Sequence, residues 1–171
     1  MTPTPESFCY GGLLFYHLFP GEIRIPEATH GLPLPVPTNV VPKSPPNLAV
    51  YNPIFDQPGA PNLEPASISL DFKCNRTAQS FDLRSLCYSC IAGVPEGAIN
   101  PPLHGKLEIK GSNSGGDREA ETFPFTPNGN NMKCVNVPQE SLKDVQKLEL
   151  RCNGGLLKLA IELDDMVFVL H

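Results

Sequence analysis

The chain has 171 residues, of which 40% are hydrophobic and 18% are charged, and its formal net charge is −5. This length fits one domain, residues 1–171, that can bury a sizeable core. The apolar content excludes a disordered chain. The lack of a basic cluster argues against nucleic acid and anionic membrane surfaces as partners. The apolar stretch 8–19 is too short to span a bilayer.

The first 20 residues contain an aromatic-rich segment with Tyr10, Phe15, Tyr16 and Phe19. Such a segment can present a surface on which a sugar ring stacks, and Tyr10 is therefore a candidate ligand-binding residue. The alternative is core packing, because the chain has only 9 phenylalanines and 4 tyrosines and no tryptophan to fill its interior. We favour core packing for this segment as a whole.

A proline-rich region follows, residues 20–65, which holds 12 of the 20 prolines. Proline inside a helix costs about 3 kcal/mol, so this region is predicted to form loops, turns and short edge strands. Long loops of this kind usually carry function. We therefore expect Tyr51 and Asn52 to bind a ligand, with Asn47 as a further hydrogen-bonding partner.

The rest of the chain has the pattern of β-strands. Polar and apolar residues alternate in segments 66–73, 106–110 and 147–152, and turn-forming residues occupy 111–117, 128–131 and 153–155. Alternation marks strands that are buried on one face, and the third turn suits a tight hairpin. The segment 138–145 is the best helical candidate, but it is long enough for a single turn only. The pattern predicts an all-β protein, an antiparallel sandwich or barrel.

The cysteines form an even set in a charge-poor, proline-rich chain, and they are Cys9, Cys74, Cys87, Cys90, Cys134 and Cys152. This pattern predicts disulfide bonds and hence a secreted, extracellular protein. The sequon at Asn75 adds a predicted glycosylation site.

Cys87 and Cys90 have the spacing of a redox motif, but they lie on the predicted strand 83–91. Residues three apart on a strand face opposite sides, so we expect these two cysteines to pair elsewhere, in structural bonds. Whether Cys134 pairs with Cys152 stays open.

Several segments occur in an order that resembles a known family: residues 10–15, 44–52, 107–113, 121–127, 132–137, 142–150 and 161–171. They are similar to motifs of secreted fungal and bacterial domains with a galactose-binding-like, carbohydrate-binding-module-like jelly roll. The resemblance implies a β-sandwich of jelly-roll type with one long proline-rich excursion. The family usually opens with an acidic strand that has no counterpart here, so we expect either a monomer or a dimer formed through an unpaired edge strand.

The resemblance also implies a structural calcium ion at the start of the last strand. Asp164 and Asp165 supply hard oxygen ligands there, and Glu6 is a candidate for the missing third carboxylate. The alternative is a solvated strand start, since adjacent residues on a strand face opposite sides.

The sequence contains no metal-protease, serine-hydrolase or phosphate-loop motif, so we expect a non-enzyme. The expected function is a non-catalytic binding domain whose ligand is a cell-wall or host glycan. One alternative is a fungal effector-like domain that binds a host surface protein through the proline-rich region. Another is a hydrolase with an unrecognised active site. An exposed aromatic beside amides favours the first, an exposed apolar patch the second, and a deep pocket with paired acids the third.

Overall fold

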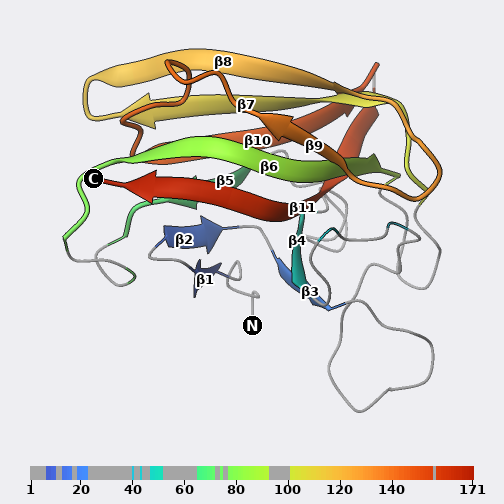
Figure 1. The fold of residues 1–171 in the computed structure, drawn as a ribbon, viewed down its shortest axis with the longest axis horizontal. Coiled ribbons are helices and arrows are strands. Elements are labelled where there is room, and N and C mark those ends of the chain that lie inside the picture. Colours follow the sequence, from blue (N-terminus) through green and yellow to red (C-terminus); the bar gives the residue numbers. More distant parts are fainter. Residues whose placement is uncertain are drawn as a thin grey trace, which may run out of the picture.

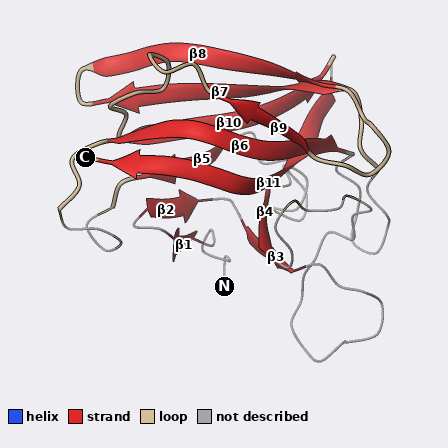
Figure 2. Ribbon diagram, in the orientation of Figure 1, coloured by secondary structure: helices blue, strands red, loops and turns tan. Residues whose placement is uncertain are grey.

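The computed structural model describes residues 7–10, 13–16, 19–22, 40, 43, 47–51, 65–71, 74, 77–92, 101–155 and 157–171. These residues form an all-β protein with eleven strands and no helix (Figures 1 and 2). Every strand pair is antiparallel, as the alternating pattern predicts. None of the described residues supplies a helical segment that can cross a membrane.

The strands of the first half are short. They are β1 (Ser7–Tyr10), β2 (Leu13–Tyr16), β3 (Phe19–Glu22), β4 (Asn47–Tyr51) and β5 (Ala66–Ser69). The proline-rich region contributes β3 and β4 to this set. Pro20 lies in β3, which pairs only with β4 among the described strands, and an edge position of this kind tolerates the missing N–H of proline.

The strands of the second half are longer. They are β6 (Phe81–Ile91), β7 (Gly105–Asn113), β8 (Gly116–Phe125), β9 (Lys133–Asn136), β10 (Lys147–Gly154) and β11 (Leu157–Leu170). The predicted strands correspond to β5, β7 and β10, and the turn at Gly155 joins β10 to β11 as a tight hairpin. Segment 138–145 forms turns rather than a helix.

The pairings divide the strands into two groups, and β11 of the second group also pairs with β10 of the first. The first group runs β1-β2-β5-β10-β7-β8, and the second runs β3-β4-β11-β6-β9. The first residues of β11, up to Leu159, pair with β10, and the strand then pairs with β6 from Ala160 onward. One long strand therefore connects the two groups without a loop.

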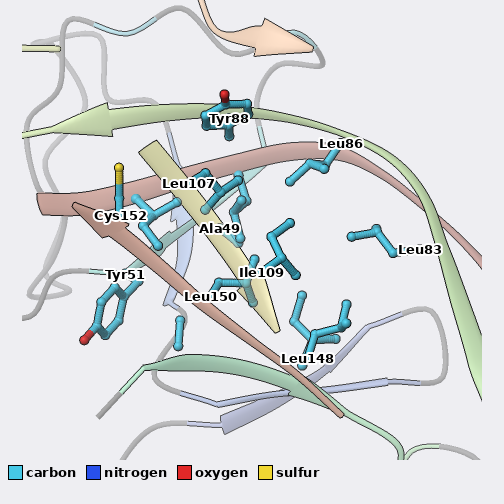
Figure 3. Packing of buried hydrophobic residues seen from close by; sticks show 14 of the residues in the cluster. Ala49, Tyr51, Leu83, Leu86, Tyr88, Leu107, Ile109, Leu148, Leu150 and Cys152 are labelled. Atoms are coloured by element: carbon cyan, nitrogen blue, oxygen red, sulfur yellow. The ribbon is translucent and has the colours of Figure 1, made fainter. Parts of the chain in front are cut away.

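The main core contains side chains from both groups. Figure 3 shows Leu107, Ile109 and Leu150 of the first group clustered with Leu86 and Tyr88 of the second. All five are 1% exposed or less. Burying each such side chain contributes roughly 1.5–3 kcal/mol, which makes this cluster the main stabilising feature of the fold.

Two further contacts tie β8, at the edge of the first group, to the second group. The Tyr88 hydroxyl and the Lys133 ammonium both donate hydrogen bonds to the carbonyl oxygen of Pro124, at 2.9 and 2.6 Å. The Tyr88 ring also packs against Phe125, with ring centroids 5.7 Å apart. These bonds hold β8 beside β6 and β9.

All six cysteines form disulfide bonds, as predicted. The pairs are Cys9–Cys74, Cys87–Cys134 and Cys90–Cys152. Cys87 and Cys90 pair elsewhere, as their positions on one strand predict. The pairing of Cys134 with Cys152, which the sequence left open, does not form.

Candidate functional site

The outer face of β6 and β11, opposite the main core, carries an irregularity at the position of the predicted calcium ligands. The register between the two strands shifts between Asp164 and Val167, which marks a β-bulge. Asp165 has a φ angle of 45°, a conformation that few residues other than glycine adopt. The Asp165 N–H donates to Oδ1 of Asp164 at 2.7 Å, and this bond stabilises the bulge. Asp164 is buried, whereas Asp165 is exposed.

A pocket of about 470 Å³ lies next to this bulge. Its polar lining comes from Lys43, Ser85, Asn136 and Asp165. Its other lining residues are the apolar Leu86, Val135, Met166 and Val167 and the Cys87–Cys134 disulfide. Three strands, β6, β9 and β11, therefore position most of the pocket, and the disulfide joins two of them.

The pocket offers several hydrogen-bonding groups and little net charge. An amide, a hydroxyl, an ammonium and a carboxylate can together donate to and accept from a ligand rich in hydroxyl groups. The described lining includes a single carboxylate, Asp165, and no histidine. The groups of the described lining can bind a ligand through hydrogen bonds.

A second polar cluster surrounds Asp82, whose side chain is only 2% exposed. Its Oδ2 accepts from Arg84 at 2.6 Å and lies 3.2 Å from Nε2 of His171, and its Oδ1 accepts from the Asp144 N–H at 2.8 Å. Burial raises the pKa of Asp82, but the Asp144 N–H, His171 and Arg84 outweigh it and hold the pKa below its ordinary value of 3.8. Asp82 is therefore a buried carboxylate that stays ionised, and Arg84 balances its charge.

Sequence reasoning missed this cluster because its members are far apart in the chain. Asp82 and Asp144 are 62 residues apart, and the loop that carries Asp144 is shaped by positive φ angles at Leu142 (48°) and Asp144 (52°). The only local signal is an acidic residue at the start of a strand, two positions before an arginine.

Metal ligands were predicted at Asp164, Asp165 and Glu6. Glu6 lies outside the described residues. The described residues do not complete a calcium site around Asp164 and Asp165, because one Asp164 oxygen already accepts the Asp165 N–H and no third acidic group joins them. Calcium takes 6–8 oxygen ligands, so this pair alone does not fit it.

Within the described part of the chain, one group of three side chains has metal-ligand spacing: Asp82, Asp144 and His171, with ligand atoms within 4.8 Å of one another. Both carboxylate oxygens of Asp82 already accept hydrogen bonds, and the Arg84 guanidinium lies on the same oxygen as His171. A cation would have to displace these partners.

Among the predicted ligand-binding residues, Tyr51 is the one whose side chain the structure describes. Tyr51 is 5% exposed and belongs to the main core, which supports a packing role for this aromatic residue. Tyr10 and Asn47 lie in β1 and β4, but the structure does not describe their side chains. Asn52 and the predicted glycosylation site Asn75 lie outside the described residues.

Two buried acidic residues, Glu162 and Asp164, lie on the outer face of β11 and were not predicted as a pair. Glu162 is fully buried opposite Ser89 of β6. Nearby on the same face, Val40 of the proline-rich region packs against Ile91 and Ala160. Part of the proline-rich region therefore contributes to a second, smaller core.

Comparison with protein-family models, curated proteins and solved structures finds no match for this chain.

Proposed function

We propose that this protein is a secreted, non-catalytic binding domain that binds a cell-wall or host glycan in the pocket beside Asp165. The observation that carries the proposal is the lining of that pocket, with Ser85, Asn136 and Asp165 next to apolar Met166 and Val167. Ligand sites combine apolar walls with a few placed polar groups in this way. The amide and the carboxylate can bind sugar hydroxyls, while Val167, which is 50% exposed, can contact the C–H face of the ring.

The architecture proposed with this function is a jelly-roll β-sandwich. Its support is the division of the strands into two groups with one apolar cluster formed by both, and the Cys90–Cys152 bond that links β6 of the second group to β10 of the first.

The proposed location is extracellular. Three disulfide bonds persist in oxidising compartments and are rare in the cytosol. The sequon at Asn75 supports the same location.

A second candidate function is binding to a host surface protein. It is favoured by three exposed apolar residues near the end of β11, Val167 (50% exposed), Val169 (39%) and Leu170 (36%). Exposed apolar side chains that lie close together mark protein-interaction sites when they form a large patch.

The test is a glycan-array assay on the purified, oxidised protein, in calcium and in EDTA. We expect binding to a defined polysaccharide that EDTA does not change. Asn136→Ala removes the amide, and Asp165→Asn removes the charge and replaces one acceptor oxygen with a donor. Each should weaken binding about tenfold, because a hydrogen bond with a charged or desolvated partner contributes about 1.5 kcal/mol. Asparagine tolerates the positive φ at position 165, so this variant preserves the bulge.

The matched control is Glu140→Gln, which removes a carboxylate whose side chain is 89% exposed and which is not part of the pocket lining. It should bind like the parent protein. Absence of glycan binding, or binding that neither pocket variant weakens, would refute the proposal. The first of these outcomes would leave the protein-binding candidate.

A further inference from the structure

The three disulfide bonds differ in their surroundings. Cys90 and Cys152 are 0% and 2% exposed and lie in the main core. Cys134 is exposed, and its bond to Cys87 lines the pocket. Because a thiolate must reach a sulfur atom to exchange with it, the Cys87–Cys134 bond is open to an external thiol and the Cys90–Cys152 bond is not.

The exposed bond also holds a short edge strand. β9 has only four residues and pairs with β6 alone among the described strands, with Cys87 directly opposite Cys134. The same four residues supply Val135 and Asn136 to the pocket. A short edge strand of this kind has few hydrogen bonds to keep it in place, so it belongs to the least stable part of a fold.

We propose that the Cys87–Cys134 disulfide is a redox switch that sets the position of β9 and thereby opens or closes the binding pocket. The proposal rests on the proposed function only in its last step, the effect on ligand binding. Selective reduction and the release of β9 are independent of any ligand.

The chemistry requires an external dithiol as reductant. Its thiolate attacks Sγ of Cys134, forms a mixed disulfide and releases Cys87 as a thiolate, which takes up a proton. The second thiol of the reductant then closes its own disulfide and releases Cys134. Two electrons and two protons pass from the dithiol to the protein, and no other reactant is needed.

The first experiment titrates the oxidised full chain with dithiothreitol under native conditions, traps free thiols by alkylation and locates them by peptide mass spectrometry. We expect Cys87 and Cys134 to be labelled at least tenfold faster than Cys90 and Cys152. Simultaneous reduction of the two bonds, or faster reduction of the core bond, would overturn the proposal.

The second experiment follows backbone hydrogen exchange. Reduction of the Cys87–Cys134 bond should accelerate exchange in residues 133–136 at least tenfold and leave β10 protected. The double variant Cys87→Ala/Cys134→Ala should show the same acceleration without reductant. Unchanged exchange in 133–136, in the reduced protein and in this variant, would show that the bond does not hold β9.

The matched control is Cys9→Ala/Cys74→Ala, because Cys9 is also exposed but its bond does not line the pocket. This control should leave exchange in 133–136 at the parent rate. If a glycan ligand is found, its affinity should fall at least tenfold on reduction of the parent protein, and unchanged affinity would refute the switch. If no glycan binds, the labelling and exchange results still decide whether β9 is under redox control.

Discussion

The two faces of β6 differ in composition and in what they do. Leu86, Tyr88 and Cys90 lie in the main core, whereas Ser85 and Cys87 line the pocket on the opposite side. Strand alternation therefore places one cysteine of the Cys87-x-x-Cys90 segment on each face, and each has its own partner on a different strand. A single strand thus supports the stability of the fold on one side and a candidate function on the other.

The largest difference between the two faces of β6 should lie in how much their disulfide bonds contribute to the free energy of unfolding. The core bond closes a loop of 62 residues and the pocket bond one of 47. Each bond stabilises the fold by about 4 kcal/mol because it restricts the unfolded chain. The two loop lengths change this contribution by only about 0.2 kcal/mol. Cys90→Ala/Cys152→Ala also creates a cavity in the core, so we expect it to lower the free energy of unfolding by about 1–2 kcal/mol more than Cys87→Ala/Cys134→Ala does.

Urea unfolding of the two double variants measures this difference directly. Equal losses would show that the core bond contributes no packing beyond its chain restriction. A larger loss for the pocket bond would reverse the assignment of the two faces.

The Asp82 cluster gives the next largest effect. Asp82→Asn should cost about 1–3 kcal/mol, because it removes the anion that accepts from Arg84 and the Asp144 N–H in a buried site. The pKa of Asp82 is below 3.8 in the fold, so its contribution to stability is present above about pH 4 and is lost as the pH falls through the lower, folded pKa. Thermal unfolding between pH 2 and pH 7 should show this loss for the parent and not for the variant.

Asp144→Asn is the matched control for that measurement. The Asp144 contribution to Asp82 comes from its backbone N–H, which asparagine keeps, and asparagine tolerates the φ of 52°. A loss as large as that of Asp82→Asn would contradict the assignment of Asp82 as the central group.

The sequence predicts the core-facing side of the strands well, because the alternation of polar and apolar residues is a local pattern. Alternating residues place β5, β7 and β10, and the same alternation predicts different partners for Cys87 and Cys90. The sequence does not choose the partners, because a disulfide pairing depends on which strands are neighbours in space. Cys87 pairs with Cys134 because β9 lies beside β6, and Cys90 reaches Cys152 across the core.

The outer face of β6 and β11 is harder to predict, because its arrangement depends on which strands are neighbours in space. Alternation places Asp164 and Asp165 on opposite sides of β11, whereas a bulge with a left-handed residue decides their exposure. The pocket needs residues from β6, β9 and β11 together with Lys43, and the Asp82 cluster needs a contact across 62 residues. No short motif in the chain encodes either arrangement.

A substitution at Tyr88, in the core, should have a smaller effect on the free energy of unfolding. Tyr88→Phe removes the hydrogen bond to the Pro124 carbonyl and should cost about 1 kcal/mol in urea unfolding. Burial raises the pKa of Tyr88 to about 12, above its ordinary value of 10. The neutral phenol is thus favoured by the fold, and its contribution to stability is full below about pH 10 and is lost between pH 10 and 12.

An absorbance titration at 295 nm should therefore show one of the four tyrosines ionising near pH 12, and Tyr88→Phe should remove that step. Ionisation of Tyr88 near pH 10 would show that the hydroxyl is in contact with water and that β8 does not cover it.

The smallest expected effect concerns the exposed end of β11. Val169→Ser should change the free energy of unfolding by less than about 0.5 kcal/mol, because the residue is 39% exposed and pairs through its backbone with Asp82. A loss above 1 kcal/mol in urea unfolding would place this residue in packing rather than on a free surface. If the side chain is free and the protein binds a host protein, Val169→Ser should weaken that complex. Glycan binding should stay unchanged, because Val169 is not among the residues that line the pocket. This variant therefore separates the two candidate functions on a protein of unchanged stability, which the larger substitutions in the core cannot do.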